Sequence, residues 1–580
     1  MFQAHLLLLG SLIAGSAPSA APLQDPGPLP PNVLVILIDD IGVDSVATYG
    51  RSPDAPPTPT MDALASTGVL FRNAWSSPNC SPTRATLQTG RYGFRTGIGA
   101  IITYTFGTGP ALPLSEVTIP EVLDLGTQNA YAHGAFGKWH LGSLDVGGPL
   151  APNMAGYAHF AGTLTNLNGG DNFFQWTKVT DGVEERSTTY ATTDTVDSTL
   201  AFIASVSEPW MCSVNFHSGH FPLHEPPAHL HTQDLTGASV STNPRAYFKA
   251  MVEALDTEIG RLLGTLDPAV AANTLIFLIG DNGTEAPVAA PPPYFSPGSK
   301  GSLYEGGINV PFIVSGPGVA WQGESLEFVH TVDVLPTIAG AAGLDLGALY
   351  PGLPIDGVDL GPHLADPAQT TREIAFVERF APNGPGNPIP APPCFDPSVP
   401  FCQADIGFGG PGNLQLSMCG EPLYGGAGVP LKLENCLPGA VSFLLRGEVQ
   451  NAVPYFGGTI VPFPPSYFIV GVADANGEIV RTIVNLSEPA TNFYQAASLD
   501  PSLPQGLAFS NAVRAENLEM NQRAARNARY KLIWNVYLCS EEFFDLLADP
   551  SETTDLLAAG PLSSTALDNY LSLRGYLDSL

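Results

Sequence analysis

Three largely apolar runs, each followed by polar residues, form the clearest pattern along this chain. Runs that are apolar on both faces are typical of central strands in a sheet that helices cover on both sides. Ligands of such open sheets bind beyond the carboxyl ends of the strands. We therefore expect the polar residues to gather at one edge of a sheet. The runs and their polar ends are 32–38 with Asp39 and Asp40, 210–216 with His217, and 273–280 with Asp281 and Asn282.

Helix-like stretches separate these runs at 60–67, 119–125 and 246–266. Alternation of strand and helix patterns is typical of α/β proteins. We predict a large, mostly parallel or mixed sheet sandwiched by helices, and we assign it to residues 32–372.

The pattern changes from residue 373 onward. Strand-like segments at 373–380 and 528–535 predict a smaller antiparallel-sheet subdomain over residues 373–580. A Gly- and Pro-rich stretch at about 382–510 is predicted to be an insertion in this subdomain. It contains four cysteines, which in an oxidising compartment indicate two disulfides of unknown connectivity: Cys394, Cys402, Cys419 and Cys436. Cys212 lies in an apolar run and is predicted to be a buried free thiol.

The N-terminus resembles a secretory signal peptide at residues 1–21, with an apolar run from Leu6 to Gly15 but no Lys or Arg before it. Residues 22–31 form a Pro-rich spacer. Farther along, no uninterrupted apolar run has the length of a bilayer span. We expect an exported protein, either periplasmic or secreted, without a membrane partner.

Composition limits the partners. The 580 residues carry 23 Lys+Arg against 54 Asp+Glu, a formal net charge of -31. Binding to nucleic acid or to anionic membranes depends on basic surface, so both are excluded as expected partners. An anionic substrate would need a local basic pocket to overcome this negative field.

The segment CSPTRATLQTGR, which begins at Cys80, predicts a short capped helix. Ser81 suits the N-cap, Pro82 the first helical position and Gly90 the end of the helix. Cys80 would then lie at a helix N-terminus, where free N–H groups favour an anion. Arg84 adds a planar fork of donors that suits a tetrahedral oxyanion. A structural cysteine before an ordinary helix is the alternative.

Asp39, Asp40, Asp281 and Asn282 offer only oxygen ligands, from two strand ends. Such ligands suit Ca²⁺ or Mg²⁺ and not zinc. Caps of the following helices are the alternative for either pair alone. Two such pairs at strand ends favour a metal site.

Further candidate residues occur in three short segments. Lys138 and His140 lie two residues apart in GKWHLG, so both can face one pocket. Lys300 begins KGSLYEGG, whose glycines indicate a turn. His220 lies in HFPL between two other histidines, His217 and His224. A zinc site of spacing H-x₂-H-x₃-H is an alternative there, although Pro222 opposes a continuous helical face.

Taken in order, these segments resemble the motifs of the type I, formylglycine-dependent sulfatases of the alkaline-phosphatase superfamily. CSPTR matches the C-x-P-x-R signature, with Thr83 where that family most often has serine, and GKWHLG matches without a departure. HFPL resembles H-x-P-L, and KGSLYEGG resembles K-x-x-x-x-E-G-G. Near the C-terminus, DPSE resembles the closing D-P-x-E segment.

The resemblance implies a sulfuric ester hydrolase that cleaves a sulfate monoester, of a small molecule or a saccharide, to an alcohol and inorganic sulfate. A formylglycine-generating enzyme would convert Cys80 to formylglycine, whose hydrated aldehyde is the nucleophile. One divalent cation is implied, with Ca²⁺ preferred to Mg²⁺. The implied metal ligands are Asp39, Asp40, residue 80, Asp281 and Asn282. The implied catalytic residues are Cys80, Arg84, Lys138, His140, His220 and Lys300.

The resemblance also implies roles. Asp281 would help to activate the attacking hydroxyl, and Arg84, Lys138 and Lys300 would neutralise the sulfuryl group. His220, with Lys300, would protonate the leaving alcohol, with His217 as a weaker candidate. His140 would help to expel sulfate. Two alternatives stay open: a phosphonate or phosphate ester hydrolase of the same superfamily, and a catalytically silent binding protein.

Overall fold

The structure of the protein is a computed structural model. The residues it describes are 30–580 except 103–110, 168, 291–297, 382, 385–400, 403, 421–427, 448–449, 456–457, 463–465, 485–490, 517–519 and 537–539. The predicted signal peptide and most of the predicted spacer lie outside the described residues.

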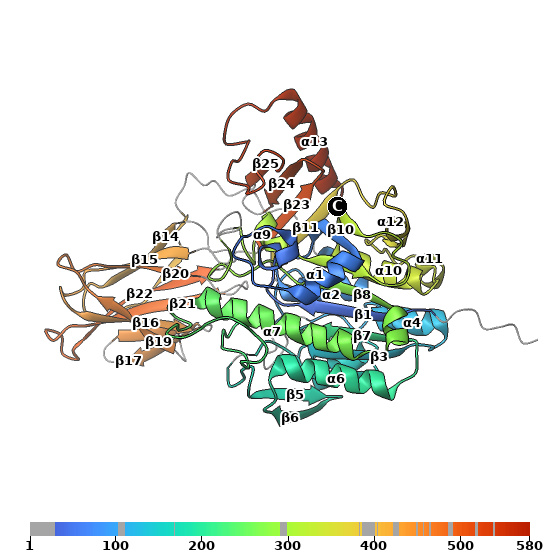
Figure 1. The fold of residues 1–580 in the computed structure, drawn as a ribbon. Coiled ribbons are helices and arrows are strands. Elements are labelled where there is room, and N and C mark those ends of the chain that lie inside the picture. The colour runs from blue at the N-terminus through green and yellow to red at the C-terminus, as the bar shows by residue number, and fades with distance from the viewer. Residues whose placement is uncertain are drawn as a thin grey trace, which may run out of the picture.

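One mixed sheet of ten strands forms the centre of the molecule (Figure 1). β1 (Asn32–Ile38) lies in its middle and pairs in parallel with β7 (Trp210–Asn215) and β8 (Thr274–Gly280). These strands are the three apolar runs, so their prediction as central strands is confirmed. Beyond β8 the order is β9 (Phe312–Ser315), β2 (Val69–Trp75) and β10 (Gly323–His330); beyond β7 it is β3 (Ala132–Lys138), β4 (His159–Thr163), β5 (Trp176–Thr180) and β6 (Val183–Ser187).

Helices cover both faces of this sheet. Alternate side chains of β1 point to opposite sides, and all of them are buried because helices pack on each side. Val33 and every second residue after it join one core cluster, and Leu34 and its alternates join the other. The helices are α4 (Ile119–Thr127) and α10 (Val334–Ala341) on the first face, and α1 (Pro59–Thr67), α6 (Ala191–Ser205) and α7 (Pro244–Thr265) on the second. The predicted helices at 60–67, 119–125 and 246–266 are confirmed, with their ends displaced by one or two residues.

A second, antiparallel sheet of four strands contains the C-terminal segments (Figure 1). Its order is β11 (Ala375–Ala381), β23 (Met520–Arg526), β24 (Tyr530–Asn535) and β25 (Ser540–Asp545). The last helix, α13 (Ser564–Ser579), packs on β23 and β24. The two strands predicted at 373–380 and 528–535 are thus confirmed as members of one small sheet, in which β23 lies between them.

The chain between β11 and β23 forms further antiparallel sheets beside the main body (Figure 1). One has the order β12 (Phe401–Cys402), β14 (Gln415–Gly420), β15 (Gly428–Glu434) and β20 (Ile479–Val484). The other has the order β13 (Ala404–Gly407), β22 (Leu507–Glu516), β21 (Thr491–Leu499), β16 (Val441–Gly447) and β19 (Ser466–Val472), and a hairpin pairs β17 (Gln450–Tyr455) with β18 (Gly458–Pro462). Leu416, Leu431 and Leu444 belong to a core of their own.

A buried ionic network joins the C-terminal sheet to the main body. Glu305, the first residue of the short helix α9 (Glu305–Ile308), contacts Arg526 at 3.1 Å and Lys531 at 3.2 Å. Glu552 contacts Lys531 at 2.7 Å and accepts a 2.5 Å hydrogen bond from the backbone N–H of Glu305. Lys531 is fully buried, and its ammonium group also lies over the ring of Trp75. Buried charges persist only when they are paired, so this network fixes the turn that precedes α9.

Two cysteine predictions have different outcomes. Cys212 is a buried free thiol, as predicted. Cys436 is also a buried free thiol whose Sγ lies 3.8 Å from Ser442 Oγ, so the prediction that it joins a disulfide is wrong. Its place in the apolar core of the inserted sheets explains the thiol, which packs there as a small hydrophobic group. The backbones of Cys402 and Cys419 face each other on β12 and β14, and Cys394 lies outside the described residues.

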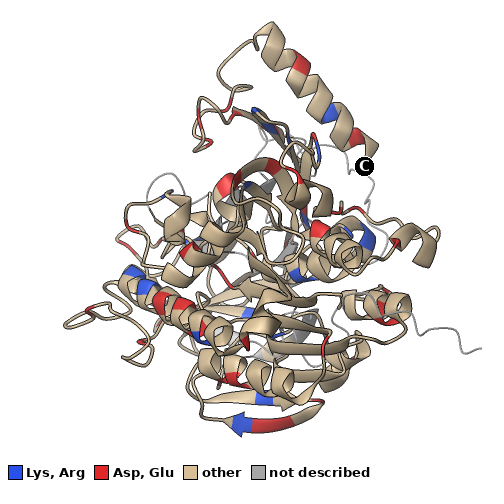
Figure 2. Ribbon diagram, turned by 45° about the vertical axis from the view of Figure 1, so that its right-hand side comes forward, with Lys and Arg blue, Asp and Glu red and all other residues tan. Residues whose placement is uncertain are grey.

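Acidic residues are spread over the helices and loops that surround the sheet (Figure 2). None of the helices in the described ranges combines the length and the apolar composition that crossing a membrane requires.

Glu378 on β11 gives a prediction on stability. It is buried, and its Oε1 accepts a 2.6 Å hydrogen bond from the backbone N–H of Phe94. Burial raises its pKa from 4.5 to about 7. Between these pH values the folded protein binds more protons than the unfolded chain, so the free energy of unfolding falls as pH rises from 4.5 to about 7.

Glu378→Gln removes this ionisation. We expect the variant and the wild type to be similarly stable near pH 4, and the variant to be more stable near pH 8, by up to about 3 kcal/mol. Thermal melting of both proteins across this range measures the difference. Parallel curves of Tm against pH would contradict the assignment.

Candidate active site

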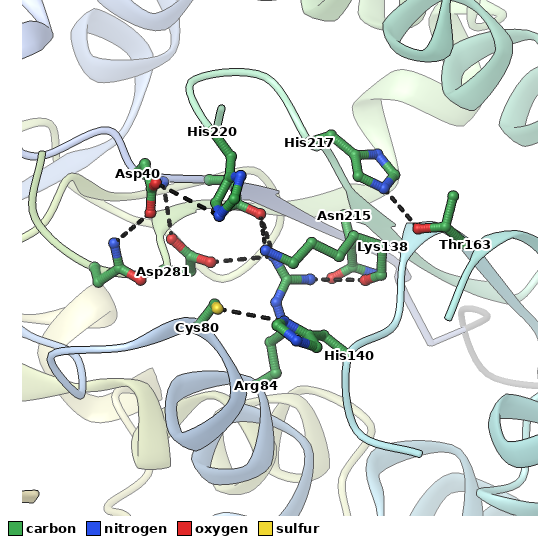
Figure 3. Close-up of polar contacts among 12 residues, drawn as sticks. Asp40, Cys80, Arg84, Lys138, His140, Thr163, Asn215, His217, His220 and Asp281 are labelled. Carbon is green, nitrogen blue, oxygen red and sulfur yellow. Dashed lines mark hydrogen bonds and ion pairs between the residues drawn. The ribbon is translucent and has the colours of Figure 1, made fainter. Parts of the chain in front are cut away.

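Two pairs of polar residues meet at the carboxyl edge of the central sheet because β1 and β8 are parallel neighbours. Ile38 is in register with Gly280, so Asp39 and Asp281 leave the sheet side by side. The backbone N–H of Asp40 donates a 3.0 Å hydrogen bond to Asp281 Oδ1, and Asn282 Nδ2 donates at 2.7 Å to Asp40 Oδ1. Asp39, Asp40, Asp281 and Asn282 are all buried. These four candidate metal ligands therefore lie together, and Figure 3 shows Asp40 and Asp281 among them.

Cys80 is the first residue of α2 (Cys80–Thr89), and its side chain is fully buried. The predicted cap is one correction: the N-cap is Asn79, two residues before the predicted Ser81. Ser81 Oγ instead accepts a 3.0 Å hydrogen bond from the backbone N–H of Ile102, so its side chain is used to hold another segment. Gly90 ends the helix in the left-handed conformation, as predicted.

Three basic side chains reach the acids from three different elements. Arg84, one turn into α2, contacts Asp39 at 3.2 Å and Asp281 at 3.1 Å. Lys138, the last residue of β3, contacts Asp39 at 2.5 Å. Lys300 contacts Asp40 at 2.6 Å. Each cation is thus held with its donors turned toward one small volume, which is what binding of a tetrahedral oxyanion requires.

His140 lies against Cys80, with 3.3 Å between its Nδ1 and the Sγ of Cys80 (Figure 3). The backbone of His140 has φ of 59°, a left-handed conformation that turns the chain just after β3. The side chains of Lys138 and His140 consequently both enter the site, as the two-residue spacing predicts.

The cluster of oxygens fits a divalent cation. Asp39 Oδ1 and Asn282 Oδ1 are buried and have no hydrogen-bond partner in the described part of the chain. Ligand atoms of Asp39, Asp40 and His220 lie within 4.8 Å of one another. Buried oxygens without partners are costly, and a hard cation would satisfy them. The donors present therefore match Ca²⁺ or Mg²⁺.

Electrostatics in the cluster lead to the same conclusion. Burial alone would raise the pKa of Asp39, but the charges of Lys138, His220 and Arg84 together lower it. Burial and the negative charge of Asp39 raise the pKa of Asp281. Two carboxylates that repel each other in a buried site are relieved by a bound cation.

Burial also determines the protonation states of Cys80 and His140. It raises the pKa of the Cys80 thiol, which therefore stays protonated and is a poor nucleophile as it stands. Burial, together with the charges of Lys138 and Arg84, lowers the pKa of His140 well below its usual range, so its imidazole is neutral.

The three histidines near HFPL do not converge on one point. His220 Nε2 lies 3.9 Å from Asp40 Oδ2. His217 Nε2 is instead bonded to Thr163 Oγ1 at 2.7 Å, and His224 Nε2 to the hydroxyl of Tyr190 at 3.1 Å. The zinc alternative is therefore not supported by the described residues, and His220 is the histidine that joins the acidic cluster.

The structure also places polar residues at the site that the sequence did not single out. Thr284 Oγ1 donates a 2.6 Å hydrogen bond to Asp44 Oδ1 and accepts one of 3.0 Å from the backbone N–H of Gly42. This contact ties the loop after β1 to the loop after β8. Thr284 directly follows Asp281-Asn282-Gly283, which is the only sequence signal for it. No sequence signal indicates Thr163, whose place beside the site follows from its pairing with Lys138 in the sheet.

Comparison with known proteins points to one family. Residues 31–344 match the family model for sulfatase. The chain is 29% identical to arylsulfatase A of Bos taurus over 384 residues, which cover 60% of this chain and 70% of that protein. It is 30% identical to N-acetylgalactosamine-6-sulfatase of Sus scrofa over 402 residues, which cover 64% and 72%.

Solved structures share the fold. Ps i-CgsB in complex with k-i-k-neocarrahexaose superimposes with a TM-score of 0.59 at 18% identity, covering 95% of this chain and 93% of that one. A protein solved with its substrate D-glucosamine-2-N,6-O-disulfate gives a TM-score of 0.56 at 15% identity, covering 95% and 98%.

The oxygen cluster predicts cation-dependent stability. With free Ca²⁺ at about 100 times its Kd, we expect Tm to rise by roughly 2–5 °C over protein treated with chelator. Asp40→Asn should reduce this calcium-dependent shift, because it removes a charged ligand. Asp54→Asn is the control, since Asp54 is exposed and pairs only with Arg245 and Lys249 among the described residues. An undiminished shift in Asp40→Asn would contradict the site.

Proposed function

The chain belongs to the sulfatase family, and we propose that it hydrolyses a sulfate monoester of a saccharide through a formylglycine at position 80 and one divalent cation. That the protein is a sulfatase follows from its family. The observation that carries the mechanism is the meeting of Cys80, three cations and four oxygen ligands at one sheet edge. The sulfate group of a monoester is tetrahedral and negatively charged, and this site offers it Arg84, Lys138 and Lys300.

Position 80 and the oxygen cluster would supply the chemistry that the other side chains lack. A hydrated aldehyde at position 80 supplies a nucleophilic oxygen where the buried thiol is inert. A cation held by Asp39, Asp40, Asp281 and Asn282, beside residue 80, would act as a Lewis acid toward sulfate oxygens. We prefer Ca²⁺ to Mg²⁺ because four side chains offer oxygen ligands, whereas Mg²⁺ is usually bound through only one or two carboxylates and keeps several waters.

The remaining residues neutralise charge and move protons. Arg84, Lys138 and Lys300 are already fixed by ion pairs, so they would stabilise the transferring sulfuryl group with little reorganisation. His140 is neutral and next to position 80, so it would accept the proton of the second hydroxyl as sulfate leaves. His220, at the side of Asp40, would protonate the leaving alcohol, together with Lys300.

A saccharide sulfate is the substrate class we propose. One relative is named N-acetylgalactosamine-6-sulfatase. Of the proteins that share the fold, one was solved with k-i-k-neocarrahexaose and another with its substrate D-glucosamine-2-N,6-O-disulfate. Partners would then be this substrate and a formylglycine-generating enzyme. Export to the periplasm or the medium is part of the proposal and depends on the apolar run from Leu6 to Gly15.

The proposed modification of Cys80 can be tested by mass spectrometry and by substitution. In protein from its native host, the tryptic peptide Asn73–Arg84 should have the mass of an aldehyde in place of the thiol. Cys80→Ala should lower kcat on an aryl sulfate by at least roughly 10³-fold, because the nucleophile is lost. An unmodified Cys80 in active protein would refute this mechanism. The intact mass of the same sample tests export, since chain cleaved near residue 21 is expected.

The identity of the transferred group is tested by comparing substrates. We expect kcat/KM on 4-nitrophenyl sulfate to exceed that on 4-nitrophenyl phosphate by roughly 10-fold or more, a difference of about 1.4 kcal/mol in transition-state stabilisation. A higher value on the phosphate would favour the phosphate or phosphonate ester hydrolase alternative. Cys80→Ala is the matched control for a contaminating phosphatase.

A further inference from the structure

A cavity of about 370 Å³ lies between the segment after Lys300 and the C-terminal sheet. Its volume is within the range of saccharide- and drug-sized ligand pockets. Residues 301–304 form one wall. The polar side chains of the other wall come from β11, β23, β24 and β25: Arg379, Gln522, Asn535, Ser540 and Glu542.

Arg379 is the residue of this cavity that indicates a bound ligand. Its Nη1 donates to the backbone oxygen of Gly301, whereas its buried Nε has no hydrogen-bond partner. In the parts of the chain that the structure describes, Arg379 forms no ion pair, and burial lowers its pKa to about 10. A desolvated guanidinium without a carboxylate partner is costly, and an anionic ligand would supply the missing charge.

The rest of the cavity suits hydroxyl groups. Both carboxylate oxygens of Glu542 lie 2.9 Å from the hydroxyl of Tyr304, which donates to them, and Glu542 also lines the cavity. Gln522 and Ser540 can donate and accept. The cavity thus offers a guanidinium group for an anion, beside a carboxylate and amides for hydroxyl groups. These are the groups that would bind an acidic sugar.

The cavity wall is continuous with the candidate active site. Gly301 directly follows Lys300, and its backbone N–H donates a 2.9 Å hydrogen bond to the oxygen of Pro78, two residues before Cys80. The backbone N–H of Lys300 bonds to the oxygen of Thr284 at 3.1 Å. The backbone of Gly301 is therefore bonded both to the segment that precedes Cys80 and to Arg379.

We infer that this cavity is a second saccharide subsite, in which Arg379 binds the anionic substituent of the sugar unit next to the one that carries the scissile sulfate. The anion is a second sulfate or a uronate carboxylate. The inference rests on the proposed function, which it deepens by requiring a substrate of at least two sugar units with an acidic group on each.

The test compares substrates of different length in Arg379→Met. The probes are 4-nitrophenyl sulfate, sulfated galactan disaccharides with a second sulfate, and sulfated glycosaminoglycan disaccharides with a uronate. We expect kcat/KM on one class of disaccharide to fall by roughly 10- to 100-fold, mainly through KM, and the loss on 4-nitrophenyl sulfate to be at least tenfold smaller. The disaccharide affected identifies the anion.

A purely structural role for Arg379 gives a different result. If Arg379 only holds Gly301, its loss displaces Lys300 and lowers kcat/KM equally on the aryl sulfate and on both disaccharides, which would overturn the inference. Gln522→Ala is the second variant, should Arg379→Met fail to fold, with the same substrate-dependent loss expected. Arg529→Met is the control. It removes a guanidinium that pairs with Asp545 of the same sheet, and it should leave kcat/KM unchanged on all three kinds of probe.

Binding separates failure of this inference from failure of the proposed function. Calorimetry on Cys80→Ala with the same disaccharides needs no turnover. Kd should rise roughly tenfold when Arg379→Met is added. If the wild type hydrolyses none of the probes, the proposed function fails while this measurement still decides on the subsite. Binding that is absent in Cys80→Ala, or unchanged by Arg379→Met, overturns the subsite.

Discussion

The parallel pairing of β1 with β8 is the constraint on which the rest of the site depends. It places buried carboxylates from two distant segments side by side, an arrangement that repulsion and desolvation both oppose. Three other elements of the site bring a positive charge to this point. The pairs are Arg84 with Asp39 and Asp281, Lys138 with Asp39, and Lys300 with Asp40.

The formal charges of the carboxylates and the basic side chains at this point cancel. Three carboxylates, Asp39, Asp40 and Asp281, face the three cations Arg84, Lys138 and Lys300. A sulfate monoester carries one negative charge, so a divalent cation and the ester that bind together would add one positive charge to the site. This local excess of positive charge would favour an anionic substrate, whereas the net charge of -31 on the whole molecule opposes the approach of free anions.

Sequence reasoning predicted the parts of the site that follow from local pattern. Apolar runs ending in acids identified β1 and β8, and short motifs identified Cys80, Lys138 and His220. What it missed depends on contacts between segments far apart. The cap of α2 moved to Asn79 because Ser81 is used to hold Ile102. The thiol of Cys436 is enclosed by strands whose pairing the cysteine spacing does not encode. The network of Glu305 with Lys531 and Glu552 joins charges that no sequence pattern connects.

The insertion between β11 and β23 also determines when the site can be completed. Ala375 pairs with Arg526, so these neighbouring strands are 151 residues apart in the chain, and a contact of such long range forms late because loop closure costs entropy. Lys531 and Glu552 lie beyond it, so the turn that carries Lys300 gains its anchor only when nearly the whole chain has been synthesised. Cys80 is fully buried in the finished fold, so the proposed conversion to formylglycine would have to precede this closure. The length of the insertion would then extend the period in which a modifying enzyme can reach Cys80.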